Sequence, residues 1–243
     1  MATYVLVHGA WAGAWCWRDV GSLLVDAGHT VVTPTLTGLG ERASAATPDV
    51  GVDTHVRDLD DQLRVLDCAD VILVAHSYAG TVATVAVEAN GDRVVRLVYV
   101  DAFVPTNGRS TFDYFPAEIC AHMRASADEH GHGWLIPATD ETLDLWAVAD
   151  PAIRAWVGPR LTDFPIRCFE QPVTLTGAGV GPARTYLSCT DGPIEGVFTQ
   201  FAVRARSEGW DHRDLAAGHA VWATAPRLLA EALLDLPEAR RTS

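Results

Sequence analysis

The chain has 243 residues, of which 49% are hydrophobic and 20% are charged, and its formal net charge is −13. This length and composition fit one globular domain, and the acidic charge disfavours nucleic acid or an anionic membrane surface as a partner. All 18 basic residues are arginine, so the absence of lysine excludes Schiff-base chemistry and a P-loop lysine.

Membrane and export signals are not expected in this chain. No apolar run approaches the ~20 residues that cross a bilayer, and no basic-then-apolar leader precedes the first strand. The five cysteines lie at positions 16, 68, 120, 168 and 189, without a C-x-x-C pair. This odd and scattered set predicts reduced thiols in a cytoplasmic protein, with neither a zinc site nor a disulfide framework.

In the first part of the chain, short apolar strands alternate with amphipathic helices. Residues 34–51 interrupt this alternation with little periodicity, and we expect them to form a loop. The alternation predicts an α/β fold, in which a mostly parallel sheet is covered by helices on both faces and built from right-handed crossovers. The expected strands are 4–8, 30–33, 71–74 and 94–100, and the expected helices are about 17–27, 53–68 and 81–90.

The alternation stops between residues 106 and 182. This stretch contains Trp134, Trp146 and Trp156 and several amphipathic fragments. We expect it to be a helical cap, inserted after the strand that ends near Val100 and lying over the carboxyl edge of the sheet; a second domain is the alternative. Residues 1–105 and 183–243 then form the core, whose later elements are a strand at 184–190, a helix at 194–205, a strand at 211–215 and a helix at 225–235.

A serine lies where a buried strand passes into a helix, in the stretch Ala75-His76-Ser77-Tyr78-Ala79. This pattern predicts a nucleophile elbow, a tight turn that holds the serine at the carboxyl edge of the sheet. The usual pattern has glycine where Ala75 and Ala79 stand, and alanine keeps the turn feasible with some strain where φ is positive. A serine in an ordinary strand-to-helix turn is the alternative. His76 is expected to point away from the nucleophile.

A serine hydroxyl becomes a nucleophile when a base takes its proton and an acid orients that base. In this type of fold the three residues occur in the order serine, acid, histidine, each in a loop after a strand. Ser77, Asp191 and His219 follow this order. Asp101 is the alternative acid, because it also ends a strand.

An acyl-transfer site also needs hydrogen-bond donors for the developing oxyanion. We expect these to be the backbone N–H of Tyr78, directly after the nucleophile, and that of Ala10, in the loop after the first strand. Trp11, Phe103 and Trp134 are candidates to line the substrate, although tryptophans in a cap are equally explained by packing. The other histidines show no spacing that identifies a metal site.

Four segments together resemble the α/β-hydrolase superfamily, and within it the group of plant methyl esterases, hydroxynitrile lyases and their bacterial relatives. The resemblance covers nearly the whole chain. It implies a lidded α/β-hydrolase core, a triad of Ser77, Asp191 and His219, an oxyanion hole from Ala10 and Tyr78, and no cofactor. The segments are Val5-Leu6-Val7-His8-Gly9-Ala10-Trp11, Ala75-His76-Ser77-Tyr78-Ala79-Gly80, Tyr186-Leu187-Ser188-Cys189-Thr190-Asp191 and Gly218-His219.

The chain departs from the family pattern at three places. Both elbow glycines are alanine, and the segment that ends at Asp191 is one residue shorter than the family's form. The lyase branch has a lysine directly after the catalytic histidine, whereas this chain has Ala220. This last difference argues against a hydroxynitrile lyase of the known type.

The predicted function is hydrolysis of a small, largely apolar carboxylic ester or lactone through an acyl-enzyme on Ser77, by a monomer or homodimer without cofactor or metal. One alternative uses the same triad for lyase, C–C cleavage or cyclisation chemistry in small-molecule biosynthesis. Another is a small-molecule binding protein on this scaffold, because a fold does not determine a function. A nucleotide-binding oxidoreductase is disfavoured, since Gly9-x-x-x-Gly13 lacks the spacing G-x-G-x-x-G.

Overall fold

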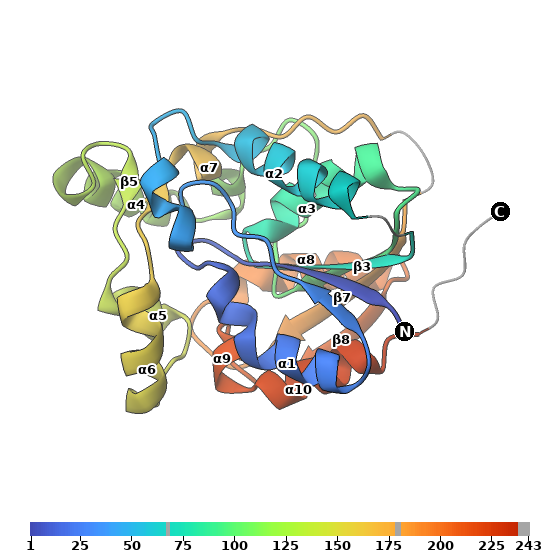
Figure 1. Cartoon of the computed structure of the whole chain (residues 1–243). Coiled ribbons are helices and arrows are strands. Elements are labelled where there is room, and N and C mark those ends of the chain that lie inside the picture. Colours follow the sequence, from blue (N-terminus) through green and yellow to red (C-terminus); the bar gives the residue numbers. More distant parts are fainter. Residues whose placement is uncertain (67–68, 178–180, 238–243) are drawn as a thin grey trace.

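A computed structural model describes residues 1–66, 69–177 and 181–237 of the chain (Figure 1). Its centre is a parallel sheet of six strands in the order β2-β1-β3-β4-β7-β8. The predicted parallel α/β sheet is confirmed. The strands are β1 (Thr3–Val7), β2 (Thr30–Val32), β3 (Val71–His76), β4 (Val94–Val100), β7 (Ala183–Cys189) and β8 (Asp211–Leu215).

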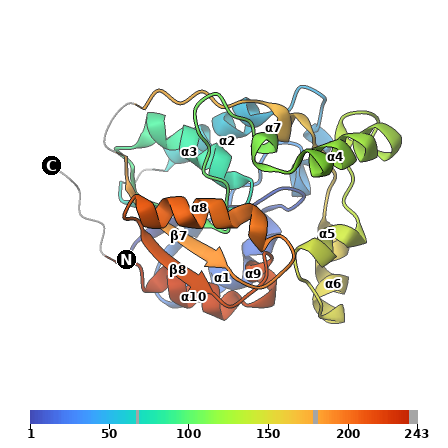
Figure 2. The same cartoon turned by 180° about the vertical axis from the view of Figure 1, so that it is seen from behind.

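Helices cover both faces of this sheet (Figures 1 and 2). One face packs against α2 (Val52–Val65), α3 (Ala79–Asn90) and α8 (Glu195–Ser207). The other packs against α1 (Arg18–Asp26), α9 (Val221–Thr224) and α10 (Pro226–Leu234). Alternating side chains of the strands feed the two core layers, as a strand buried on both faces requires. In β1, for example, Val5 belongs to the first layer and Leu6 to the second.

The element boundaries differ little from the prediction. Before β4, two 3-10 helices were not expected, η1 (Ala14–Trp17) before α1 and η2 (Gly40–Ala45) within the predicted loop. The expected helix 53–68 is α2, which ends at Val65, and residues 67 and 68 lie outside the described residues. Cys68 is therefore not described, while the other four cysteines are free and buried. Within the described residues, no helix combines the length and apolar character needed to span a bilayer.

Between β4 and β7 the chain forms several short elements beside the carboxyl edge of the sheet (Figure 1). A two-stranded antiparallel sheet of β5 and β6 lies among them. The division into a core and a cap stays a prediction. The elements are η3 (Thr111–Tyr114), α4 (Ala117–His130), β5 (Leu135–Ile136), α5 (Asp140–Leu145), α6 (Pro151–Val157), η4 (Gly158–Arg160), β6 (Phe164–Pro165) and α7 (Arg167–Glu170).

The last part of this stretch runs back along the outgoing part. Backbone hydrogen bonds join Val173 to Gly108 and Arg109, and the N–H of Leu175 donates to the Asn107 side chain. Further along, the Glu88 carboxylate of α3 accepts hydrogen bonds from the backbone N–H groups of Thr176 and Gly177. The return path to β7 is thus attached both to its own beginning and to the helix layer.

Candidate active site

Ser77 occupies the turn between β3 and α3, and its φ of +56° lies in the left-handed region. Such a backbone is strained for any residue except glycine and is typical of a nucleophile elbow. The positive φ falls on Ser77 itself and not on Ala75 or Ala79, so alanine at those positions carries no such strain. The close approach in this turn is at Gly80, where a Cβ would overlap the carbonyl oxygen of Phe103.

The loop after β1 packs directly on the elbow. A Cβ on Gly9 would lie 2.8 Å from the Cβ of Ser77 and 3.0 Å from Nδ1 of His76, so only glycine allows this contact. The next residue, Ala10, and the residue after the nucleophile, Tyr78, are both buried. In the described part of the chain, neither of their backbone N–H groups donates a hydrogen bond. Two free donors beside the serine are what the predicted oxyanion hole requires.

His219 lies in the loop that follows β8 and is paired with a carboxylate. Its Nδ1 is 2.6 Å from Oδ2 of Asp101, and both side chains are almost fully buried. Asp101 directly follows β4 with a φ of +44°, and its Oδ1 accepts the N–H of Cys189 at 3.3 Å. Because a carboxylate can only accept, Nδ1 donates to it and Nε2 of His219 keeps a free lone pair.

The acid expected from the sequence, Asp191, does not contact the imidazole. Its side chain is exposed, and among the described residues its carboxylate accepts one long hydrogen bond, of 3.5 Å, from Thr190. The backbone N–H of Asp191 donates to Ala217 instead, which attaches the loop after β7 to the loop that carries His219. The alternative acid, Asp101, is therefore the partner of His219. Asp101 follows β4, which is the neighbour of β3, the strand that ends at the nucleophile turn.

Ser77 and His219 line the same cavity, of about 130 Å³, at the carboxyl edge of the sheet. Of the three lining residues expected from the sequence, Trp11 and Phe103 line it and Trp134 does not. Trp134 belongs to the turn before β5, where its backbone carbonyl accepts the N–H of Ile166. The lining is otherwise mostly apolar, with a few polar side chains: Phe115, His122, Met123, Ser126, Ile136, Pro137, Thr139, Glu141, Thr142, Leu145, Trp146, Phe169, Ile194, Val197 and Phe198.

Aromatic rings pack around the site, and one of them, Phe198, was not predicted from the sequence. The ring of Phe198, in α8, stacks on the imidazole of His219 with centroids 4.9 Å apart and planes 15° apart. No local pattern marks this residue, because its position depends on how α8 packs. Trp11 links the core to the segment between β4 and β7, donating its indole N–H to the carbonyl of Ile136.

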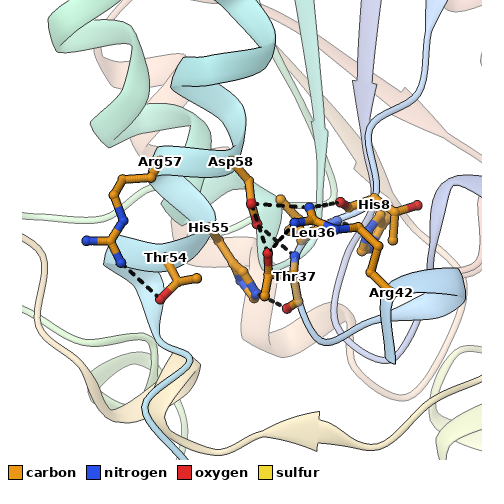
Figure 3. A network of polar contacts seen from close by, with 9 residues as sticks. His8, Leu36, Thr37, Arg42, Thr54, His55, Arg57 and Asp58 are labelled. Carbon is orange, nitrogen blue, oxygen red and sulfur yellow. Dashed lines mark hydrogen bonds and ion pairs between the residues drawn. The ribbon is translucent and has the colours of Figure 1, made fainter. Parts of the chain in front are cut away.

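Two further buried histidines, His8 and His55, belong to a network of polar contacts (Figure 3). His8 is hydrogen-bonded to the carbonyl of Gly9 and the backbone N–H of Leu36. His55 is hydrogen-bonded to the carbonyl of Thr37 and the hydroxyl of Tyr78. Burial lowers the pKa of each to about 4. With both ring nitrogens bonded, these histidines are neutral parts of the scaffold.

A cysteine near one of these histidines gives a second candidate nucleophile. Sγ of Cys168 lies 3.7 Å from Nδ1 of His55. Burial raises the pKa of the Cys168 thiol to about 12, so it stays protonated at neutral pH and is a poor nucleophile. Among the described residues, no cluster of three or more His, Cys, Asp or Glu side chains could hold a metal ion.

A parallel α/β sheet with a strained serine, a buried histidine–carboxylate pair and free backbone donors at its carboxyl edge defines the class of α/β-hydrolases. The family model described as "Alpha/beta hydrolase family" matches residues 4–232, and the chain belongs to this family. The superfamily predicted from the sequence is thereby confirmed.

Named relatives narrow the class. A carbendazim hydrolyzing esterase from Nocardioides sp. (strain SG-4G) is 36% identical over 245 residues, covering 97% of this chain and 100% of that protein. The putative methylesterase 11, chloroplastic, of Arabidopsis thaliana is 26% identical over 246 residues, covering 96% of this chain and 63% of that longer protein.

Solved structures agree with these relatives. An extracellular α/β-hydrolase from a Paenibacillus species, described as sharing structural and functional homology with tobacco salicylic acid binding protein 2, has a TM-score of 0.84 at 25% identity. The match covers 99% of this chain and 100% of that one. Together with the esterase relatives, it makes this chain a carboxylic-ester hydrolase, as predicted.

Proposed function

We propose that Ser77, His219 and Asp101 form a catalytic triad that hydrolyses a small, largely apolar carboxylic ester or lactone. The observation that carries this proposal is the buried 2.6 Å contact between His219 and Asp101 beside a cavity that Ser77 also lines. The lone pair left on Nε2 of His219 is the base that a serine nucleophile needs. The acid is therefore assigned to Asp101 in place of Asp191.

The proposed reaction has two halves. In the first, Oγ of Ser77 attacks the ester carbonyl while Nε2 of His219 takes its proton, and the N–H groups of Ala10 and Tyr78 bind the oxyanion. The imidazolium, stabilised by Asp101, then protonates the leaving alcohol. In the second half, water attacks the acyl-enzyme with His219 again as base, and the carboxylic acid is released.

The cavity restricts the size and polarity of the substrate. Its volume of about 130 Å³ is close to the cavity of about 150 Å³ that holds benzene, so it suits a single ring or a short chain. Its wall is mostly apolar and includes aromatic side chains such as Trp11, Trp146 and Phe198, which favours an aromatic or alicyclic group. Relatives named as methylesterases and as a carbendazim hydrolyzing esterase support a small ester of this kind. Free thiols at the four described cysteines support a reducing compartment such as the cytoplasm.

A fluorophosphonate probe tests the proposal, because it reacts with a serine only when that serine is activated. We expect stoichiometric labelling of the native protein and no labelling of Ser77→Ala. The native protein should also hydrolyse p-nitrophenyl acetate, and Ser77→Ala should not. Ser126→Ala is the matched control, since Ser126 lines the same cavity but belongs to α4. Persistent labelling of Ser77→Ala, or an unlabelled native protein, would refute the assignment.

A further inference from the structure

The residue directly before the nucleophile, His76, is almost fully buried. It contacts the core layer between the sheet and the helices α1, α9 and α10. Its imidazole packs edge-on against Trp17 and Trp222. Its Nε2–H donates to the backbone carbonyl of His219 at 2.9 Å, and the two imidazole centroids are 4.6 Å apart. The residue before the nucleophile therefore holds the backbone of the residue expected to be the base.

We propose that His76 is a positioning residue, which holds the loop of His219 so that Nε2 of His219 faces Ser77. This inference rests on the proposed function and adds to it a residue that does not touch the substrate. Among the described residues that line the cavity, His76 is absent. It acts through its hydrogen bond to the backbone of His219.

The first reason is geometric. His219 is held at two points: Asp101 accepts a hydrogen bond from its imidazole, and His76 donates one to its backbone carbonyl. Because Ser77 and His76 are consecutive at the end of β3, a small shift of that strand moves the nucleophile and the support of the base together. A reaction that needs atoms placed to within about 1 Å gains from such a shared support.

The second reason is energetic. Nδ1 of His76 is buried and has no hydrogen-bond partner among the described residues. A buried polar atom without a partner is unfavourable, and an apolar ring at this position would avoid that cost. Among the described residues, the one hydrogen bond of this side chain is that to His219, so the buried imidazole has no other polar partner there.

The third reason concerns charge. Burial, with a smaller contribution from His219 and then His8, lowers the pKa of His76 well below its usual value. His76 therefore stays neutral when His219 becomes an imidazolium. A charged ring at a centroid distance of 4.6 Å would oppose that proton transfer.

Three variants separate positioning from packing. His76→Phe keeps the ring and removes the N–H, His76→Gln keeps an N–H at a similar reach, and Trp17→Phe disturbs the same packing without touching His219. For His76→Phe we expect kcat to fall by about 10- to 100-fold with KM within about twofold, because the cavity wall is unchanged. His76→Gln should recover most of kcat, and Trp17→Phe should keep it.

A second measurement does not depend on turnover. The proton in the short bond between His219 and Asp101 should give a separate far-downfield resonance in the ¹H NMR spectrum. We expect it to shift or broaden in His76→Phe and to persist in His76→Gln and Trp17→Phe. Because this resonance reports on geometry, it tests the positioning role separately from the proposed catalytic role of Ser77.

Two results would overturn the inference. One is a folded His76→Phe protein with native kcat and a native downfield resonance; the other is an equal loss of both in Trp17→Phe. Cooperative thermal unfolding establishes folding for each variant, and His76→Met replaces His76→Phe if the latter does not fold.

Discussion

Replacing Asp101 with asparagine tests the assignment of the acid most directly. The Asp101 carboxylate accepts the N–H of Cys189 at Oδ1 and that of His219 at Oδ2. An asparagine amide has one acceptor, and the backbone N–H of Cys189 requires it. The NH₂ group then faces Nδ1 of His219, which must accept in place of donating, so the proton moves to Nε2.

An imidazole with its proton on Nε2 cannot take the proton of Ser77. We expect kcat to fall by roughly 10⁴, equivalent to about 5 kcal/mol in the activation free energy. For Asp191→Asn we expect less than about a threefold change, because the Asp191 side chain is exposed and its one hydrogen bond within the described residues is from Thr190. The two variants remove the same charge, so they form a matched pair.

Steady-state and burst kinetics with p-nitrophenyl butyrate measure the effect, and thermal unfolding checks that both variants fold. A large loss of kcat in Asp191→Asn together with a near-native Asp101→Asn would show that the acid is Asp191, and the reasoning from the 2.6 Å contact would fail.

Further predictions concern stability, pH and substrate charge. Gly80→Ala should lower the free energy of unfolding by about 2 kcal/mol, because its Cβ would overlap a backbone carbonyl. Gly196→Ala, in open space within α8, should raise it by up to about 1 kcal/mol; equal urea midpoints for the two variants would contradict this. Burial lowers the pKa of His8 and His55 from 6.5 to about 4. The unfolded chain therefore binds more protons than the folded protein between these pH values. The contribution of the two neutral histidines to the free energy of unfolding is complete above pH 6.5 and is lost as the pH falls to about 4. The loss is about 3 kcal/mol for each, and urea unfolding that does not change from pH 7 to 4.5 would argue against it. Glu141 lines the cavity, so an ester that carries a carboxylate should have a higher KM than its neutral analogue. Glu141→Gln should narrow this difference, and an unchanged ratio of KM values would show that Glu141 does not face the substrate.

Most of the fold could be predicted from the sequence because the four central strands, β1, β3, β4 and β7, are largely buried on both faces. Runs such as Val71–Val74 are apolar throughout, and the helices α1 and α2 show a clear apolar face. The 3-10 helix at Gly40–Ala45 could not be found in this way. None of its residues is buried, so no hydrophobic periodicity marks it.

The residues of the site were predictable only where local sequence determines their position. Ser77 and His219 lie in turns of small residues next to a strand, and such turns are visible in the sequence. Asp101 and Asp191 each follow a strand, and their local patterns do not separate them. The distinction depends on the path of the loops after β4 and β7, which buries the first carboxylate and leaves the second in solvent.

The stretch between β4 and β7 also has a topological task. β4 ends at the carboxyl edge, whereas β7 begins at Ala183, which pairs with Arg96 near the start of β4. The polypeptide that walls the pocket is thus the same one that returns the chain to the opposite edge of the sheet. For protein engineering, selectivity is therefore better altered by point substitutions in this stretch than by trimming it. A version cut below the roughly dozen residues that a parallel crossover needs would lose the connection between two neighbouring strands along with the wall.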